Sequence, residues 1–381
     1  MATGGEVALW GHECGVDLMI RKRKFPEAAV MIVVVYIIAS LSMLAFALAF
    51  RSRIAIKQSQ LLIEMLQQDE IAHAACIQAR SILAADDESI DCLDEPWSGW
   101  HELVPAEATD HSIDVEDWSW QIYWKLVDES AKINVNLASA DILLGLECLD
   151  KAAVASILDW IDEDDVPNPD GAEDDYYSRL EPAYNCKDGP MDNIEELLLI
   201  KGITPEIYYG SSLDKENRHL TEIDIDSTEL ADLDSQNDDA GLCEMFTVYS
   251  DGRININTTS KQVLDAMPIL SDTAVSEIIS TQQSVAKRFS SMDDIQNNDN
   301  FSIADKLTLM QIAKFNSNHF QLHIKIRKKD SLFWCEYVAT IERRGRNTQV
   351  LSWQRKYRVM LKDITYFTGD SYESADSQGV N

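Results

Sequence analysis

The pattern of apolar and polar positions begins with an uncharged run at residues 28–50. As a helix this run extends for about 34 Å, which is long enough to cross a bilayer. A cleaved secretory signal is the competing interpretation, but no small-residue cleavage site closes the run before Arg51. We therefore predict a single transmembrane helix at residues 28–50.

Basic residues flank the run on both sides, four of them at 21–24 and three at Arg51, Arg53 and Lys57. Their small N-terminal excess favours a cytoplasmic N-terminus, with the rest of the chain on the far side of the membrane. Apolar residues then continue at helical spacing to about Ala85. We expect one long helix, which either packs beside similar helices or serves as a stalk.

Two later segments are near copies of each other at a constant offset of 121 residues: residues 132–158 and 253–279. Most of the shared positions are apolar or Asn, which build a core and begin a helix, so the repeat predicts a duplicated structural unit. Each copy predicts two short helices, the second at 151–161 or 272–282. We expect Asn134, Asn136 and their counterparts to cap the first helix of each copy through their side chains, together with Ser139 and Ser260.

Aromatic and β-branched residues alternate at 118–127, 320–327, 333–343 and 349–360, which predicts antiparallel strands. The resulting fold class is α+β: a long pilin-like helix, an antiparallel sheet and an inserted all-α domain of duplicated helix-hairpin-like units. The predicted parts are an N-terminal segment (1–27), the transmembrane helix (28–50), its amphipathic extension (51–95), a sheet domain (96–130 and 316–362), the helical insertion (131–315) and a disordered tail (363–381).

Composition narrows the possible functions. The net charge is −32, so the molecule as a whole repels nucleic acid. The seven cysteines form no CxxC pair and no Cys/His cluster at zinc spacing, which argues against a structural zinc site. The sequence carries none of the common hydrolase, metalloprotease or phosphate-loop motifs, and its seven histidines are scattered, so we do not expect an enzyme.

Residues 159–175 carry nine carboxylates and no Lys or Arg. Calcium suits such a segment because it accepts six to eight oxygen ligands in loose geometry. Asp162, Asp164 and Glu173 occupy positions one, three and twelve of a twelve-residue window, but Val166 and Pro167 exclude an EF-hand. A solvated acidic loop and the paired carboxylates of a hydrolase are the alternatives.

The order of several motifs resembles general secretion pathway protein K, the minor pseudopilin of type II secretion systems. These motifs are Glu95-Pro-Trp97, residues 128–136, Asp159-Trp-Ile-Asp162 with Gly171-Ala-Glu173 and Tyr176-Tyr177, and residues 195–203. The resemblance implies a pilin-like fold at the tip of a periplasmic pseudopilus, in complex with two other minor pseudopilins. It also implies bound calcium, for which the candidate ligands are Asp162, Asp164, Asp170, Glu173 and Asp174.

One position departs from that family. Its prepilins carry a Gly just before the apolar run, where a leader peptide is removed. Here residues 24–27 precede the run, and no Gly occurs between Gly15 and Gly99. The sequence therefore leaves open whether a leader is cleaved.

The main alternative function is that of a membrane-anchored helix-hairpin-helix protein for DNA binding or uptake. Such hairpins hold phosphate through backbone N–H groups in a Gly-containing turn near Lys or Arg. The corresponding turns here, 147–150 and 268–272, contain acidic residues and neither Gly nor a base. We therefore expect a structural, assembly-forming protein.

Overall fold

The computed structural model describes residues 27–103, 119–210, 240–284, 287–329 and 334–358. The chain divides into two compact units, Met1–Leu66 and Gln67–Asn381. Residues 1–26 of the predicted N-terminal segment, the predicted tail at 363–381 and residues 211–239 of the predicted insertion lie outside the described residues.

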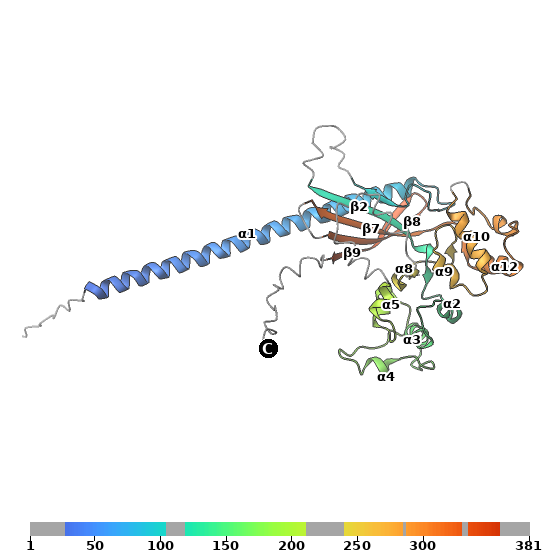
Figure 1. The fold of residues 1–381 in the computed structure, drawn as a ribbon, viewed down its shortest axis with the longest axis horizontal. Coiled ribbons are helices and arrows are strands. Elements are labelled where there is room, and N and C mark those ends of the chain that lie inside the picture. The colour runs from blue at the N-terminus through green and yellow to red at the C-terminus, as the bar shows by residue number, and fades with distance from the viewer. Residues whose placement is uncertain (1–26, 104–118, 211–239, 285–286, 330–333, 359–381) are drawn as a thin grey trace, which may run out of the picture. The chain divides into compact units, whose positions relative to one another are not determined.

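A single helix, α1, runs from Glu27 to Ala85 (Figure 1). The apolar stretch of α1 begins at Val30, in the first unit. None of the residues in its most apolar part is buried. This stretch is long and apolar enough to cross a membrane. The predicted long helix is confirmed.

Five antiparallel strands form the sheet of the second unit, in the order β1-β2-β7-β8-β9 (Figure 1). Their bounds are β1 Trp100–Glu102, β2 Trp120–Asp128, β7 His319–Lys328, β8 Trp334–Arg344 and β9 Asn347–Arg358. Side chains of β7 alternate between the two faces, so its residues 320, 322, 324 and 326 are buried. This alternation is the signal that predicted the strands from the sequence.

The last turns of α1 pack on one face of this sheet. The buried helix residues recur at helical spacing and are mostly small, which lets the helix lie close to the strands: Ala72, Ala75, Cys76, Ala79 and Leu83. Arg355 of β9 pairs with Asp69 at 3.1 Å, and the Tyr337 hydroxyl donates to the same carboxylate at 2.5 Å. Helix and sheet therefore share one core.

A helical insertion separates the neighbouring strands β2 and β7. Its first copy contains β3 (Ile133–Asn134), α2 (Ala140–Leu144), α3 (Lys151–Ile161), α4 (Asp174–Tyr177), η4 (Ile194–Leu199), α5 (Pro205–Tyr209), α8 (Leu242–Met245) and β4 (Phe246–Thr247). Its second copy contains β5 (Ile254–Asn255), α9 (Lys261–Asp265), α10 (Asp272–Gln282), α11 (Met292–Gln296), α12 (Ile303–Ile312) and β6 (Ala313–Lys314). A three-residue 3-10 turn, η3 (Glu129–Ala131), leads from β2 into the first copy. The predicted α+β class is confirmed, and each copy adds a pair of short parallel strands, β3 with β4 and β5 with β6.

The prediction that the paired Asn residues cap the following helix is wrong. Ser139 and Ser260 are the N-caps of α2 and α9, and each hydroxyl accepts from the backbone N–H three residues later. The second Asn of each pair instead binds the backbone of a later segment, Asn136 at Met191 and Asn257 at Phe289. Local sequence patterns could not predict this role, because each partner lies more than thirty residues away.

The two copies meet at equivalent positions. Gly145 ends α2, and a Cβ added there would lie 2.3 Å from the carbonyl oxygen of Ala266, its counterpart at the repeat offset. Only a residue without a side chain permits this approach of two backbones. The duplicated units therefore pack against each other where Gly145 meets Ala266.

Candidate metal centre

The acidic segment begins where α3 ends, and Asp159 closes it into a loop. This fully buried carboxylate accepts three hydrogen bonds: from the Asn168 backbone at 3.0 Å, the Asn168 amide at 2.6 Å and the Ala172 backbone at 2.6 Å. A Cβ on Gly171 would lie 1.9 Å from the same carboxylate. The Asp-Trp-Ile-Asp and Gly-Ala-Glu motifs are thus two sides of one closed loop.

A cluster of aromatic side chains packs beside the two ends of the loop. The Trp160 and Tyr177 rings meet edge to face with centroids 5.3 Å apart, and Tyr184 stacks on Tyr177 at 5.3 Å. Lys201 crosses from the next segment and donates from its ammonium to the carbonyls of Asp170 and Gly171, each at 3.0 Å. Aromatic packing and these charge-assisted bonds hold the backbone without neutralising the carboxylates.

Three of the predicted ligands converge. One carboxylate oxygen each from Asp162, Asp164 and Glu173 lies within 4.8 Å of the other two. Asp162 is the C-cap of α3, and Glu173 is the N-cap of α4, where its side chain makes no capping bond. Two helix ends and the turn between them therefore place three carboxylates around one point.

Glu173 is the most unusual of the three. Its side chain is buried, and neither of its oxygens has a hydrogen-bond partner. Burial, first of all, and the neighbouring Asp159, Asp162 and Asp188 charges together raise the pKa of Glu173 to about 7. Burial also raises the pKa of Asp162. A cation at this point would supply the missing partner and oppose both pKa shifts.

The other two predicted ligands have different surroundings. Asp170 has a left-handed backbone, with φ of 69°, and its carbonyl accepts from Lys201. The Asp174 carboxylate accepts from the Cys186 backbone at 2.6 Å and so holds the following loop in place. Neither is among the converging ligand atoms of the described residues. Calcium binding by the five predicted ligands stays a prediction.

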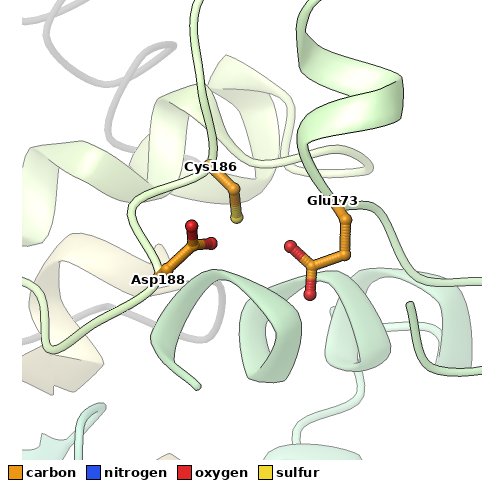
Figure 2. A group of neighbouring side chains, drawn as sticks. All are labelled: Glu173, Cys186 and Asp188. Atoms are coloured by element: carbon orange, nitrogen blue, oxygen red, sulfur yellow. The ribbon is translucent and has the colours of Figure 1, made fainter. Parts of the chain in front are cut away.

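The sequence analysis missed two residues that face the same place. Cys186 and Asp188 come from the loop after α4, and Figure 2 shows their side chains pointing toward Glu173. The ligand atoms of these three residues also lie within 4.8 Å of one another. Only the Lys187-Asp188-Gly189 turn marks them in the sequence, because their nearness to Glu173 depends on the closed loop.

Another acidic group lies near the end of α1 and already has a cation. Asp86 and Asp91 both accept from Arg343, at 3.0 and 2.5 Å, and the Arg343 side chain is 1% exposed. Glu95, the third member of the group, accepts from the Trp97 indole at 2.7 Å. This arrangement is a buried ion pair, which a metal ion would have to displace.

Both hairpin turns of the repeat are closed by acidic or hydroxyl side chains. Asp150 caps α3 by accepting from the Ala153 backbone at 2.7 Å. In the second copy, Asp305 accepts from the Ser271 backbone at 2.9 Å and from its hydroxyl at 3.0 Å. A phosphate would meet a carboxylate at each turn, so these hairpins are poorly suited to DNA.

Comparison with known proteins agrees with this geometry. Residues 131–210, which include the acidic loop, match the family model of type II secretion system (T2SS) protein K. This part of the chain is similar to protein K. It is 41% identical over 54 residues to the type II secretion system protein K of Pectobacterium carotovorum subsp. carotovorum, covering 14% of this chain and 16% of that protein. It is 27% identical over 198 residues to protein K of Klebsiella pneumoniae, covering 47% of this chain and 58% of that protein.

The alignments with these two relatives span less than two thirds of their own length. The fold extends the likeness. A chain from the crystal structure of the GspK-GspI-GspJ complex of enterotoxigenic Escherichia coli superposes with a TM-score of 0.55 at 18% identity. That likeness covers 78% of this chain and 99% of the other. The sequence carries the resemblance to protein K, and the solved structure shows that the fold is shared with a chain of that complex. The DNA-binding alternative gains no support.

Proposed function

We propose that this chain is a minor pseudopilin of a type II secretion system, a structural subunit that assists protein export across the outer membrane. One observation carries the proposal: a domain matching protein K interrupts a helix-and-sheet fold between the neighbouring strands β2 and β7. The apolar helix anchors it in the inner membrane, and the sheet and the insertion face the periplasm. Its role is assembly and not catalysis.

The partners follow from the same likeness. The similar solved structure is a complex of GspK with GspI and GspJ, and we propose that this chain likewise joins two other minor pseudopilins at the pseudopilus tip. The exposed apolar side chains of α1 from Val30 to Phe50 supply the surface that sibling helices or lipid would cover.

Assembly can be tested directly. The full chain is co-expressed with the prepilin-like proteins encoded by the same bacterium, solubilised in detergent and analysed by size-exclusion chromatography. We expect co-elution with two of them, and deletion of the gene should stop export of proteins that use the system. A chain that elutes alone, together with normal export after deletion, would refute the proposal. Tight, salt-sensitive DNA retention in filter binding would favour the alternative function.

We further propose that the acidic loop binds calcium. Asp162, Asp164 and Glu173 supply oxygen ligands, and both unpartnered oxygens of the buried Glu173 fit this role. Bound calcium would neutralise part of the carboxylate repulsion and tie the end of α3 to the start of α4. The proposed ligands Asp170 and Asp174 complete the set.

Chelation tests the calcium proposal. At a calcium concentration of 100 times the dissociation constant, binding stabilises the folded state by about 2.7 kcal/mol, which chelator removes. We expect chelator to lower the melting temperature of the detergent-solubilised full chain by several degrees. The double variant D162A/E173A should lose this response, and the matched exposed pair D165A/D175A should keep it. If chelator leaves the melting temperature of the native chain unchanged, the calcium proposal is wrong.

A further inference from the structure

A second set of ligand atoms lies beside the proposed calcium ligands and differs from them in chemistry. It combines the Cys186 sulfur with one carboxylate oxygen each from Glu173 and Asp188 (Figure 2). Glu173 is 3% exposed and Cys186 is 7% exposed, so the group is largely shielded from water. The group therefore contains one soft ligand and two hard ones.

Three buried carboxylate oxygens of this group have no hydrogen-bond partner. These are both oxygens of Glu173 and Oδ1 of Asp188, whereas the Cys186 thiol donates a long hydrogen bond to the Asp159 carbonyl at 3.7 Å. Leaving a buried acceptor unpaired costs about 1–3 kcal/mol, and more for a charged group. A cation between Cys186, Asp188 and one Glu173 oxygen would supply a partner for these buried acceptors.

The backbone fixes the direction of these side chains. The Cys186 N–H donates to Asp174 at 2.6 Å, and the Gly189 N–H donates to the Trp160 carbonyl at 3.5 Å. Lys187, between the two ligands, pairs instead with Asp192 at 2.8 Å and Glu196 at 2.7 Å. The loop thus presents Cys186 and Asp188 to Glu173 while the charge of Lys187 is engaged elsewhere.

We propose that Cys186, Glu173 and Asp188 bind a thiophilic divalent cation of the zinc class, at a position separate from the calcium ligands Asp162 and Asp164. Calcium selects oxygen ligands, whereas a thiolate selects softer ions such as zinc. Glu173 belongs to both groups and has two unpartnered oxygens, one for each ion. The proposal does not depend on the secretion function or on calcium binding.

The geometry suits a tetrahedral ion with three protein ligands and one water. Neighbouring ligand atoms around tetrahedral zinc are about 3.5 Å apart. Atoms that already lie within 4.8 Å of one another need shifts of about 1 Å to reach that arrangement. On binding, the Cys186 thiol loses its proton to solvent and the sulfur bonds to the ion. No oxidation or reduction is involved.

The test measures metal binding to the full chain in detergent, with saturating calcium and a non-thiol reductant. Zinc affinity is measured by competition with a chromophoric chelator, and cobalt replaces zinc to report sulfur ligation through its charge-transfer absorption. We expect one zinc equivalent and a cobalt–sulfur band in the native chain. C186S should lower zinc affinity at least tenfold and abolish the band.

C148S is the matched control, because Cys148 is an exposed cysteine of the same insertion. It should leave both the affinity and the band unchanged. D188N keeps the cysteine and should retain the band while weakening zinc binding, which tests the site even if C186S misfolds. Equal zinc affinity in the native chain and C186S, or a band that survives C186S, would overturn the proposal. Calcium-dependent melting that persists in C186S would leave the calcium proposal intact.

Discussion

The two copies of the repeat share a skeleton and differ in one segment. Their longer helices, α3 and α10, occupy equivalent residues, and both copies begin their first helix at a capping serine. In the first copy residues 162–190 separate α3 from Met191, whereas in the second copy residues 283–288 separate α10 from Phe289. Met191 and Phe289 are equivalent, because each exchanges two hydrogen bonds with the second Asn of its copy.

The acidic loop is therefore an insertion into one copy of a duplicated unit. In the second copy, the buried acidic group beside the hairpin is a hydrogen-bond acceptor, because Asp305 accepts from Ser271 and from the start of its own helix. In the first copy, Glu173 is buried without partners. The two copies thus share a scaffold, and the candidate metal ligands lie in the loop that only the first copy carries.

Removing the carboxylate that closes the acidic loop should have the largest effect on stability. Asp159→Ala leaves three donors without their acceptor, and we expect a loss of about 3 kcal/mol in the free energy of unfolding. Its counterpart in the second copy is Ser280, whose exposed hydroxyl contacts only the Glu277 carbonyl, so S280A should change stability little. Urea unfolding followed by tryptophan fluorescence measures both. Equal losses would contradict the difference between the copies.

Disturbing the contact between the two copies should have the next largest effect on stability. Gly145→Ala places a methyl group against the Ala266 backbone, and overpacking of this kind costs about 1–3 kcal/mol. Gly189→Ala is the matched control, because its new Cβ would meet only a carbonyl at 3.9 Å. Calorimetric melting of the two variants should differ clearly. If G145A melts like the native chain, the two copies do not pack at this point.

The paired Asn residues should have smaller and unequal effects. Asn257→Ala removes two hydrogen bonds from a site that is 3% exposed, for an expected loss of about 2 kcal/mol. Asn136→Ala removes the same pair from a half-buried site and should cost about 1 kcal/mol. Because Met191 follows the acidic loop, only N136A should also weaken calcium binding, which isothermal titration measures. Weaker calcium binding in N257A but not in N136A would contradict the placing of the calcium site in the first copy.

Local sequence patterns predicted the helices and strands well, but they could not predict contacts between residues far apart in the sequence. The bounds of α3 and α10 follow from helical periodicity and a polar cap, and the four long strands follow from alternation. The role of Asn136 could not be predicted, because an Asn before a helix has the same local pattern whether it caps that helix or binds a distant backbone. Cys186 and Asp188 were missed for a similar reason: backbone hydrogen bonds from Cys186 to Asp174 and from Gly189 to Trp160 bring them to Glu173, and no fixed spacing in the sequence marks these contacts.

The central claim is that the insertion in the first copy is the cation-binding part of the molecule. Hydrogen exchange of the full chain, measured by mass spectrometry with calcium and with chelator, tests it most directly. We predict that calcium slows amide exchange in residues 159–190 and leaves residues 280–289 unchanged. Identical exchange of residues 159–190 in both conditions would contradict the account.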